Sequence, residues 1–177
     1  FSLERALSLE SRYDDSLKTR PIGSWLAKFV LWFSVLFALY HYVTAGIGVP
    51  VDYWHMGAHM SGVIILIFIS FPAFKKLKGF DQSSDLNGPL AGVPFYDWLL
   101  IIIGVMSSLY VGVTWYGVDM NFLGFSYSIP EQVLRMGVPL PIDVVFGTLL
   151  IIVLLEAVRR TIGIIVPIII LVFIGYA

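Results

Sequence analysis

Five long apolar segments constrain the fold of this chain more than any other feature of its sequence. A helix rises 1.5 Å per residue, so about 20 apolar residues cross the roughly 30 Å of hydrocarbon in a lipid bilayer. The segments do not alternate between polar and apolar residues as the strands of a membrane barrel do. We therefore predict an all-α integral membrane protein. The predicted segments are 25–46, 56–74, 98–116, 142–158 and 162–177.

The composition agrees with this class and excludes others. The chain is 58% hydrophobic and 13% charged, whereas about a quarter of the residues of a soluble domain are charged. Its eleven basic residues, with a net charge of −1, are too few and too scattered to follow a nucleic-acid backbone. The lack of cysteine excludes disulfides, thiolate metal sites and thiol nucleophiles. We expect phospholipid as a partner and no nucleic acid.

The positions of the basic residues predict the orientation of the spans. All lysines and arginines except Arg135 lie before the first span or at its start, after the second span or after the fourth. Short loops rich in lysine and arginine stay in the cytoplasm, so we expect a cytoplasmic N-terminus in a bacterial or archaeal inner membrane. Tryptophans near the span ends agree, because indole rings favour the headgroup layer. These expected membrane anchors are Trp25, Trp54, Trp98 and Trp115.

The polar segments divide the chain into three expected parts. Residues 1–23 carry leucines among charges, which predicts either an amphipathic helix on the cytoplasmic surface or a solvated tail. Residues 24–160 form the transmembrane domain, in which Ser128 and Glu131 have capping-box spacing and predict a short outer helix. We expect that helix to end near Gly137. Residues 161–177 form a fifth segment, which either reverses at Gly163 or continues the fourth span as one bent helix.

Three histidines near the outer ends of the first two spans are candidates for a cofactor site. His55 and His59 are four residues apart on one helical face, and His41 lies at a comparable depth in the first span. Two histidines at like depth can hold a b-type haem, so a haem-binding anchor of an electron-transfer complex is the alternative function. Solvated imidazoles without a metal are the simpler interpretation. A zinc-protease motif is excluded, because Met56 follows His55 where that motif has glutamate.

Charged residues at the span ends have structural interpretations. Asp97 and Asp143 open the third and fourth spans, where a carboxylate meets the positive end of the helix dipole, and we expect both to stay hydrated. Glu156 precedes Arg159 and Arg160 at helical spacing, which predicts a local ion pair near the inner membrane surface. This junction either anchors the helix end or contacts a neighbouring helix.

Two motifs carry a resemblance to a known family. The segments SWLAKFVLWFSVLFALYHYVTAGIG, VPFYDWLLIIIGVMSSLYV and DVVFGTLLIIVLLEAVRRTIGIIVPIIILVFIGYA occur in this order, and YDWLL and LLEAVRRTIG are the specific parts. The chain resembles the N-terminal region of the fused permeases of tripartite ATP-independent periplasmic (TRAP) transporters, of the type that works with TAXI-class binding proteins. The resemblance covers essentially the whole chain. It implies four spans like those of the Q-type small subunit and a fifth that links them to an M-type transport domain.

The resemblance also implies a function without enzyme activity. In that family a periplasmic binding protein delivers an organic acid or similar solute, and Na⁺ or H⁺ flux drives its import. The substrate and ion sites belong to the M-type domain, so we expect no catalytic, cofactor, metal or substrate residue in this segment. Small residues on the third span would allow close approach of that domain. This expected interface consists of Gly104, Ser107, Ser108 and Gly112, in addition to the junction at Glu156, Arg159 and Arg160.

Overall fold

The structure, a computed structural model, describes residues 19–48, 52–73, 92–122, 124–135 and 137–176. It is mostly helical, and four of its helices are long and apolar enough to cross a membrane. The fifth, α6, is also apolar but has only 12 residues. The helices are α2 (Ser24–Ile47), α3 (Asp52–Ser70), α4 (Phe95–Thr114), α5 (Pro141–Thr161) and α6 (Ile165–Tyr176).

Local signals explain where the helices begin and end. Helix α5 begins with Pro141, whose fixed φ suits the first helical position, and Asp143 accepts a hydrogen bond of 2.7 Å from the backbone N–H of Leu140. Helix α2 ends at Ile47, and Gly48 follows it with a φ of +93°, which favours glycine. Each span lies within a few residues of its predicted place. The largest shift is that of α3, which begins and ends four residues earlier than expected.

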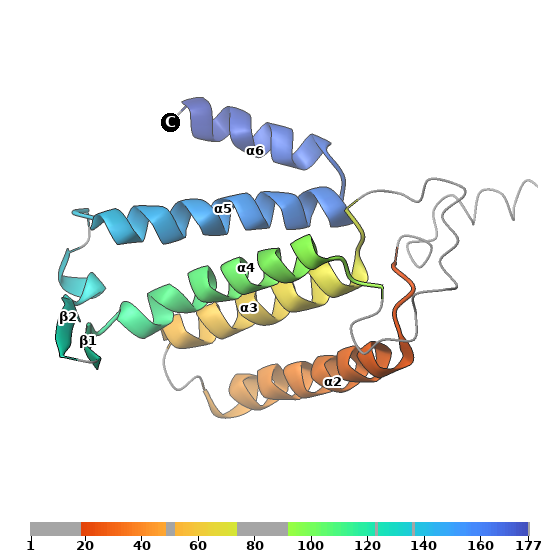
Figure 1. The fold of residues 1–177 in the computed structure, drawn as a ribbon, viewed down its shortest axis with the longest axis horizontal. Helices are drawn as coiled ribbons and strands as arrows, with labels where there is room; N and C mark the ends of the chain where they lie inside the picture. Colours follow the sequence, from red (N-terminus) through yellow and green to blue (C-terminus); the bar gives the residue numbers. More distant parts are fainter. Residues whose placement is uncertain (1–18, 49–51, 74–91, 123, 136, 177) are drawn as a thin grey trace, which may run out of the picture.

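The helices are arranged around a central pair. Helices α3 and α4 run side by side and make the most extensive contact, α5 packs against both, and α2 lies on the other side of α3 (Figure 1). Helix α2 touches α3 at few points along its length. The bundle therefore has a tightly packed part, α3, α4 and α5, and a loosely attached helix, α2.

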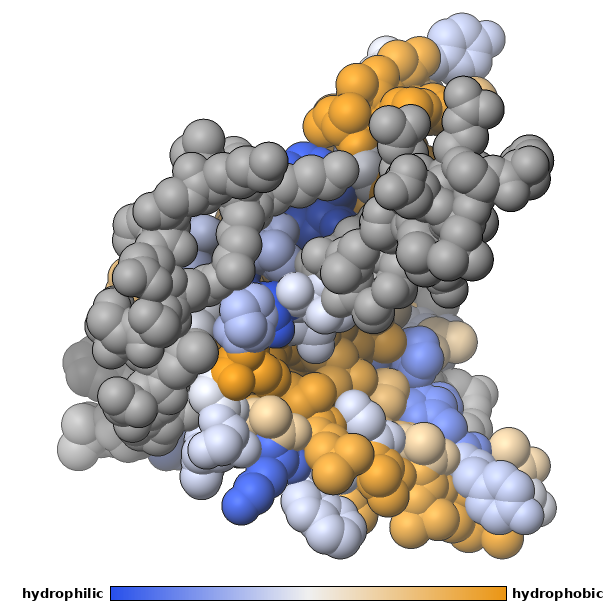
Figure 2. Space-filling model, turned by 90° about the vertical axis from the view of Figure 1, so that its right-hand side faces the viewer, coloured by the Kyte–Doolittle hydropathy of each residue, from blue (hydrophilic) through white to orange (hydrophobic). Residues whose placement is uncertain are grey.

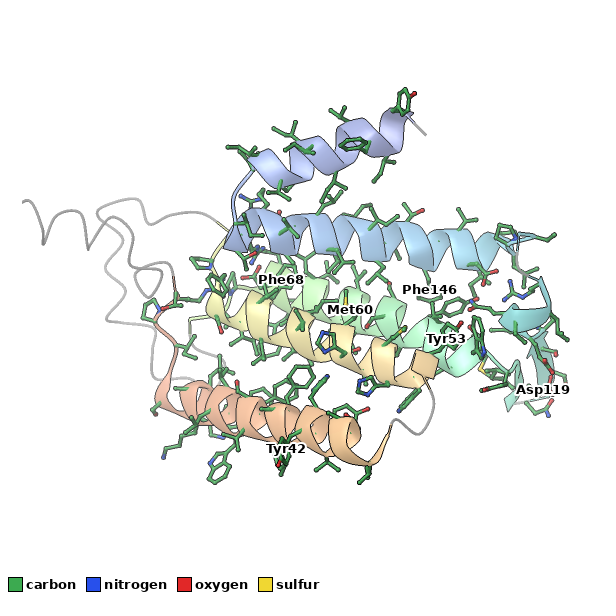
Figure 3. The ribbon with its side chains drawn as sticks, turned by 180° about the vertical axis from the view of Figure 1, so that it is seen from behind. Tyr42, Tyr53, Met60, Phe68, Asp119 and Phe146 are labelled. Carbon is green, nitrogen blue, oxygen red and sulfur yellow. The ribbon has the colours of Figure 1, made fainter. Side chains whose placement is uncertain are left out.

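The core lies where α3, α4 and α5 meet. Ile64 and Phe68 are fully buried on α3, and Val153 faces them from α5. Figure 3 shows Phe68 inside the bundle and Tyr42 of α2 pointing away from it. Lipid is as apolar as these side chains, so close packing rather than loss of water contact holds such helices together.

The outer helices expose apolar side chains. Trp32 and Leu36 on α2 are more than 60% exposed, and α6 exposes most of its residues. Figure 2 shows this hydrophobic surface over α6 at the top and over α2 at the bottom. Such a surface is compatible with contact with lipid.

The fourth and fifth apolar segments form a hairpin and not one bent helix. Helix α5 ends at Thr161 and α6 runs back across its outer side (Figure 1). Gly163 lies between them with a φ of +117°, which a residue with a side chain rarely adopts. The reversal at Gly163 considered from the sequence is therefore confirmed.

The segment between α4 and α5 differs from the prediction. It forms an antiparallel hairpin of β1 (Val118–Phe122) and β2 (Phe125–Ile129), followed by a short 3₁₀ helix, η2 (Gln132–Arg135). A short helix before Gly137 is present as expected, in the form of η2, but the capping box at Ser128 is wrong, because Ser128 lies in β2 opposite Asp119. The all-α prediction is accordingly incomplete.

Two predictions fall outside the described residues. The amphipathic segment 1–18 and the lysine-rich loop within 74–91 are not part of the described structure. Residues 19–23 are described, and Arg20 among them is buried.

Candidate functional site

The most distinctive polar feature of the described residues is a cluster of five charged side chains at one end of the bundle. It lies where α3 and α5 end and α4 begins. The cluster combines one residue before α2, one in the first turn of α4 and three in the last turns of α5. Its members are Arg20, Asp97, Glu156, Arg159 and Arg160, and we call it the ionic cluster.

Asp97 is the centre of the ionic cluster. Its side chain has no exposed surface, Arg20 pairs with one carboxylate oxygen, and Nη1 of Arg160 lies 2.7 Å from the other. The expectation that Asp97 stays hydrated is therefore wrong. An isolated buried carboxylate is very unfavourable, and the two guanidinium groups supply the countercharge that water would otherwise provide.

Glu156 joins the two arginines of α5. It accepts hydrogen bonds from Nε and Nη2 of Arg159 at 2.7 and 2.8 Å, and from Nε of Arg160 at 2.8 Å. The local pairing predicted from the sequence is confirmed. Arg160 also pairs with Asp97, so this one side chain connects α5 to α4.

The cluster also binds the end of α3 through backbone carbonyls. Arg160 donates to the carbonyl of Phe71 at 3.2 Å, and Arg159 donates to that of Ala73 at 3.0 Å. The backbone N–H of Arg20 donates to the carbonyl of Ser70 at 2.7 Å. The last carbonyls of a helix lack partners within it, so these donors satisfy groups that would otherwise need water. The cluster thus ties four parts of the chain together.

The small residues of α4 face the inside of the bundle. A Cβ atom on Gly104 would lie 2.9 Å from both Ile64 and Val153, and one on Gly112 would lie 2.9 Å from Cα of Trp54. Ser107 and Ser108, on the same helix, are also buried. The close helix approach expected here is present, but the neighbours are α3 and α5 of the same chain. These residues therefore pack within the chain, and the expected contact with an M-type domain stays a prediction.

A second polar group lies at the other end of α5. Asp143 pairs with Arg135, and it accepts hydrogen bonds from the hydroxyl of Tyr110 at 2.6 Å and the amide of Gln132 at 3.2 Å. Its side chain is 14% exposed, so the expectation of a hydrated carboxylate is wrong here too. The hydrogen bonds to Asp143 raise the pKa of Arg135 above its ordinary value, so Arg135 remains charged. This contact fixes η2 to the start of α5.

The three histidines lie together between α2 and α3. Nδ1 of His59 is 2.8 Å from Nε2 of His41, and Nδ1 of His55 is 2.8 Å from the hydroxyl of Tyr40. A bis-histidine haem site needs two imidazoles on opposite sides of a porphyrin. In this arrangement His41 and His59 are joined directly by a hydrogen bond, so the geometry does not favour the haem alternative.

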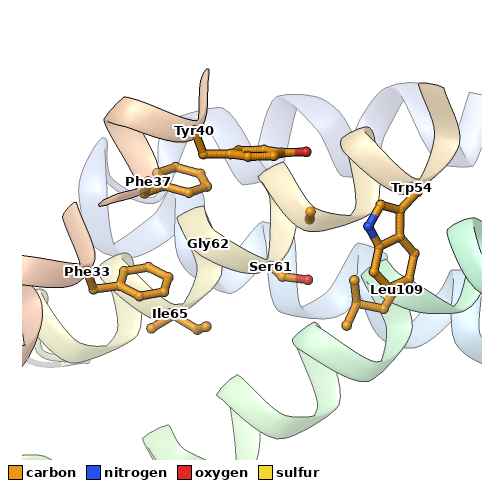
Figure 4. Close-up of a pocket in the computed structure, with 9 residues that line it drawn as sticks. Phe33, Phe37, Tyr40, Trp54, Ser61, Gly62, Ile65 and Leu109 are labelled. Carbon is orange, nitrogen blue, oxygen red and sulfur yellow. The ribbon is translucent and has the colours of Figure 1, made fainter. Parts of the chain in front are cut away.

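An apolar groove of about 340 Å³ lies between α2 and the central pair (Figure 4). Phe33, Phe37 and Tyr40 line it from α2, and Leu109 lines it from α4. Helix α3 contributes the five remaining residues that line the groove. They are Trp54, Ala58, Ser61, Gly62 and Ile65.

The four tryptophans expected to act as membrane anchors are not equivalent. Trp25 and Trp54 are 57% and 44% exposed, as an interfacial anchor would be. Trp115 stacks on Tyr53 with ring centres 3.4 Å apart, and this joins the end of α4 to the start of α3. Trp98 packs partly into the core, and its ring N–H is buried with no hydrogen-bond partner among the described residues.

Comparison of the chain with protein-family models, with curated proteins and with solved structures gave no match.

Sequence reasoning missed the contact between Arg20 and Asp97 and the one between Asp143 and Arg135. The first joins residues 77 positions apart, and no local spacing rule relates them. The second had a signal, because Arg135 is the one basic residue in the two loops expected outside, and it lies eight residues before a carboxylate.

Proposed function

We propose that this chain is the scaffold portion of a TRAP-type secondary active solute importer in a bacterial or archaeal cytoplasmic membrane. Its N-terminus faces the cytoplasm. A TAXI-type periplasmic binding protein delivers the solute, and an M-type transport domain carries it across with Na⁺ or H⁺. The chain described here provides the fixed part against which that domain moves.

The observation that carries the proposal is the pairing of the carboxylates in the four spans. Within the spans Ser24–Ile47, Tyr53–Ser70, Phe95–Thr114 and Pro141–Thr161, the acidic residues are Asp97, Asp143 and Glu156, and each pairs with at least one arginine of the same chain. A carboxylate that carries a coupling ion has to release its partner in each cycle, and such carboxylates usually face a pathway inside the membrane. Carboxylates held by arginines at helix ends suit a fixed support instead.

The positions of the two resemblance motifs also support the proposal. Asp97 belongs to YDWLL and Arg160 to LLEAVRRTIG, and their side chains form an ion pair of 2.7 Å inside the bundle. Loss of one partner of a buried ion pair typically costs about 3–5 kcal/mol. The motifs therefore act together as a brace between α4 and α5, which is a role that a fixed domain requires.

The test uses the complete permease with its binding protein in proteoliposomes. We expect Glu156→Gln combined with Arg159→Gln to lower the amount of assembled transporter, because the contacts from α5 to the end of α3 weaken. The cation concentration for half-maximal uptake and the solute affinity of the binding protein should not change. Asp119→Asn, at an exposed position of β1, is the control and should leave all three quantities unchanged. A large shift in cation dependence, or solute uptake by this chain without the M-type domain, would contradict the proposal.

A further inference from the structure

Two side-chain hydrogen bonds join α2 to α3 in the part of the chain that the structure describes, and all three histidines take part in them. Nδ1 of His59 lies 2.8 Å from Nε2 of His41, and Nδ1 of His55 lies 2.8 Å from the hydroxyl of Tyr40. The two helices otherwise touch at few points. The attachment of α2 at this end of the bundle therefore depends on side chains that change their charge between about pH 5 and pH 8.

The hydrogen positions in the pair of His41 and His59 follow from its neighbours. Nδ1 of His41 lies 2.8 Å from the carbonyl oxygen of Phe37, which can only accept, so Nδ1 carries a hydrogen. In the neutral ring, Nε2 of His41 is then the acceptor, and Nδ1 of His59 donates to it. The bond between the two helices thus requires that Nε2 of His41 has no proton.

The pair can take up one proton without loss of this bond, but not two. The first proton fits on Nε2 of the exposed His59, whose Nδ1 then donates as part of a cation and makes a stronger bond than a neutral ring does. A second proton has to go to Nε2 of His41. Two N–H groups would then point at each other across 2.8 Å, and two positive rings would have centres 4.8 Å apart. This repulsion pushes the two rings apart, and with them the two helices.

The contact of His55 with Tyr40 tolerates a change in charge. A hydroxyl group can donate to a neutral imidazole nitrogen or accept from a protonated one, so this bond survives in both states of His55. Tyr40 from α2 and His55 from α3 are the titratable groups that face the pair among the described side chains. Neither ring of the pair contacts a described carboxylate, lysine or arginine. A positive His55 adds to the repulsion, because its ring centre is 5.3 Å from that of His41.

We propose that the pair of His41 and His59 is a pH-sensitive clasp, which holds α2 against α3 at neutral pH and releases this end of α2 in acid. Release would widen the apolar groove beside the pair, because Phe33, Phe37 and Tyr40 of α2 form one of its walls. This inference does not depend on the transporter proposal.

The direction of the response follows from the number of protons that each form binds. With α2 attached, the pair holds at most one proton. With α2 released, the two imidazoles are separate, and each can take up its own proton near pH 6.5, as histidine does in water. The released form therefore binds more protons and is favoured by acid. A difference of one proton changes the ratio of the two forms by up to about tenfold per pH unit.

The test follows the position of α2 in the whole chain in detergent. Two spin labels are attached at Tyr42→Cys on α2, where the side chain points away from the bundle (Figure 3), and at Val145→Cys on α5, which is 54% exposed. The chain has no other cysteine that could react. We expect pulsed EPR to give one population of distances at pH 8. A second, longer one should grow below about pH 6, by up to about tenfold per pH unit relative to the first.

Glutamine variants separate the pair from its neighbour. The amide of His59→Gln can donate to a neutral His41 or accept from a protonated one, so the second population should be absent at pH 5. His41→Gln should behave in the same way, because its amide can also donate or accept. His55→Gln is the matched control and should keep the second population, since the pair itself is intact.

Three results would overturn the proposal. The first is a chain with all three histidines that gives the same distances from pH 8 to pH 5, a measurement that needs no variant of the pair. The second is a longer population at pH 5 in both His59→Gln and His41→Gln. The third is loss of the pH response in His55→Gln.

Discussion

Asp97 lies at the start of a span, yet it connects α4 to two other parts of the bundle. Its carboxylate has no exposed surface and pairs with Arg20 from before α2 and with Arg160 from the end of α5. Removal of either arginine leaves the buried carboxylate with one countercharge in place of two. Stability at this end of the bundle therefore depends on single residues.

Arg160 and Arg159 give a matched comparison, because they are adjacent and both bind Glu156. The side chain of Arg160 is 1% exposed and also pairs with Asp97, whereas that of Arg159 is 29% exposed. We expect Arg160→Gln to lower the free energy of unfolding by about 3–5 kcal/mol, as for a broken buried pair. Arg159→Gln should cost about 1 kcal/mol or less, because water screens a partly exposed pair.

Thermal unfolding in detergent, followed by tryptophan fluorescence, measures both variants. The expected order is wild type, then Arg159→Gln, then Arg160→Gln at the lowest midpoint. Equal midpoints for the two variants would show that the buried pair with Asp97 adds nothing to stability.

Residue-scale prediction from the sequence succeeded where contacts are local. The pairing of Glu156 with Arg159 and Arg160 follows from helical spacing. The contacts of Asp97 do not, because they depend on how three separate helix ends meet in space. An Asp at the start of a helix can be either hydrated or buried. Here the packing of α3, α4 and α5 buries it.

At the scale of elements, the apolar runs predicted the helices well. The residues of the connecting segment between α4 and α5 predicted its structure less well. The segment VDMNFLGFSYSI alternates in polarity and has a glycine at its centre, which is the signal of a two-strand hairpin. Gly124 has a φ of +85°, beside the pairing of Phe122 with Phe125. The capping-box spacing of Ser128 and Glu131 competed with this signal, so the helix was expected to start at Ser128, whereas η2 starts at Gln132 after β2.

Glycines on the helices distinguish packed faces from open ones. A Cβ on Gly57 of α3 would lie 2.7 Å from the carbonyl oxygen of Ser108 on α4, whereas one on Gly147 of α5 would have nothing within 4 Å. We expect Gly57→Ala to destabilise the protein by about 1–3 kcal/mol, as overpacking does. Gly147→Ala should be neutral or stabilising by up to about 1 kcal/mol, because alanine favours a helix.

Unfolding midpoints in the same detergent check this pair of variants. A destabilised Gly147→Ala would indicate that the open face of α5 is occupied by a further part of the protein. An unchanged Gly57→Ala would contradict the close packing of α3 on α4.

At the scale of the whole molecule, the two ends of the bundle differ in charge and in structure. One end has the ionic cluster with three arginines, and the other has the β-hairpin and Asp143 with its partners. Positive residues favour the cytoplasmic side, so the ionic cluster should lie inside and the hairpin outside. This orientation follows from the distribution of lysine and arginine along the sequence.

Labelling of single cysteines in intact cells tests this orientation most directly, and the cysteine-free chain makes the experiment clean. Ser126→Cys places a thiol at an exposed position of β2, and Ile162→Cys places one just after α5, where the side chain is 72% exposed. We expect a membrane-impermeant maleimide to label the first variant in intact cells and the second only after permeabilisation. Labelling of Ile162→Cys in intact cells, with Ser126→Cys protected, would contradict a scaffold whose ionic cluster faces the cytoplasm.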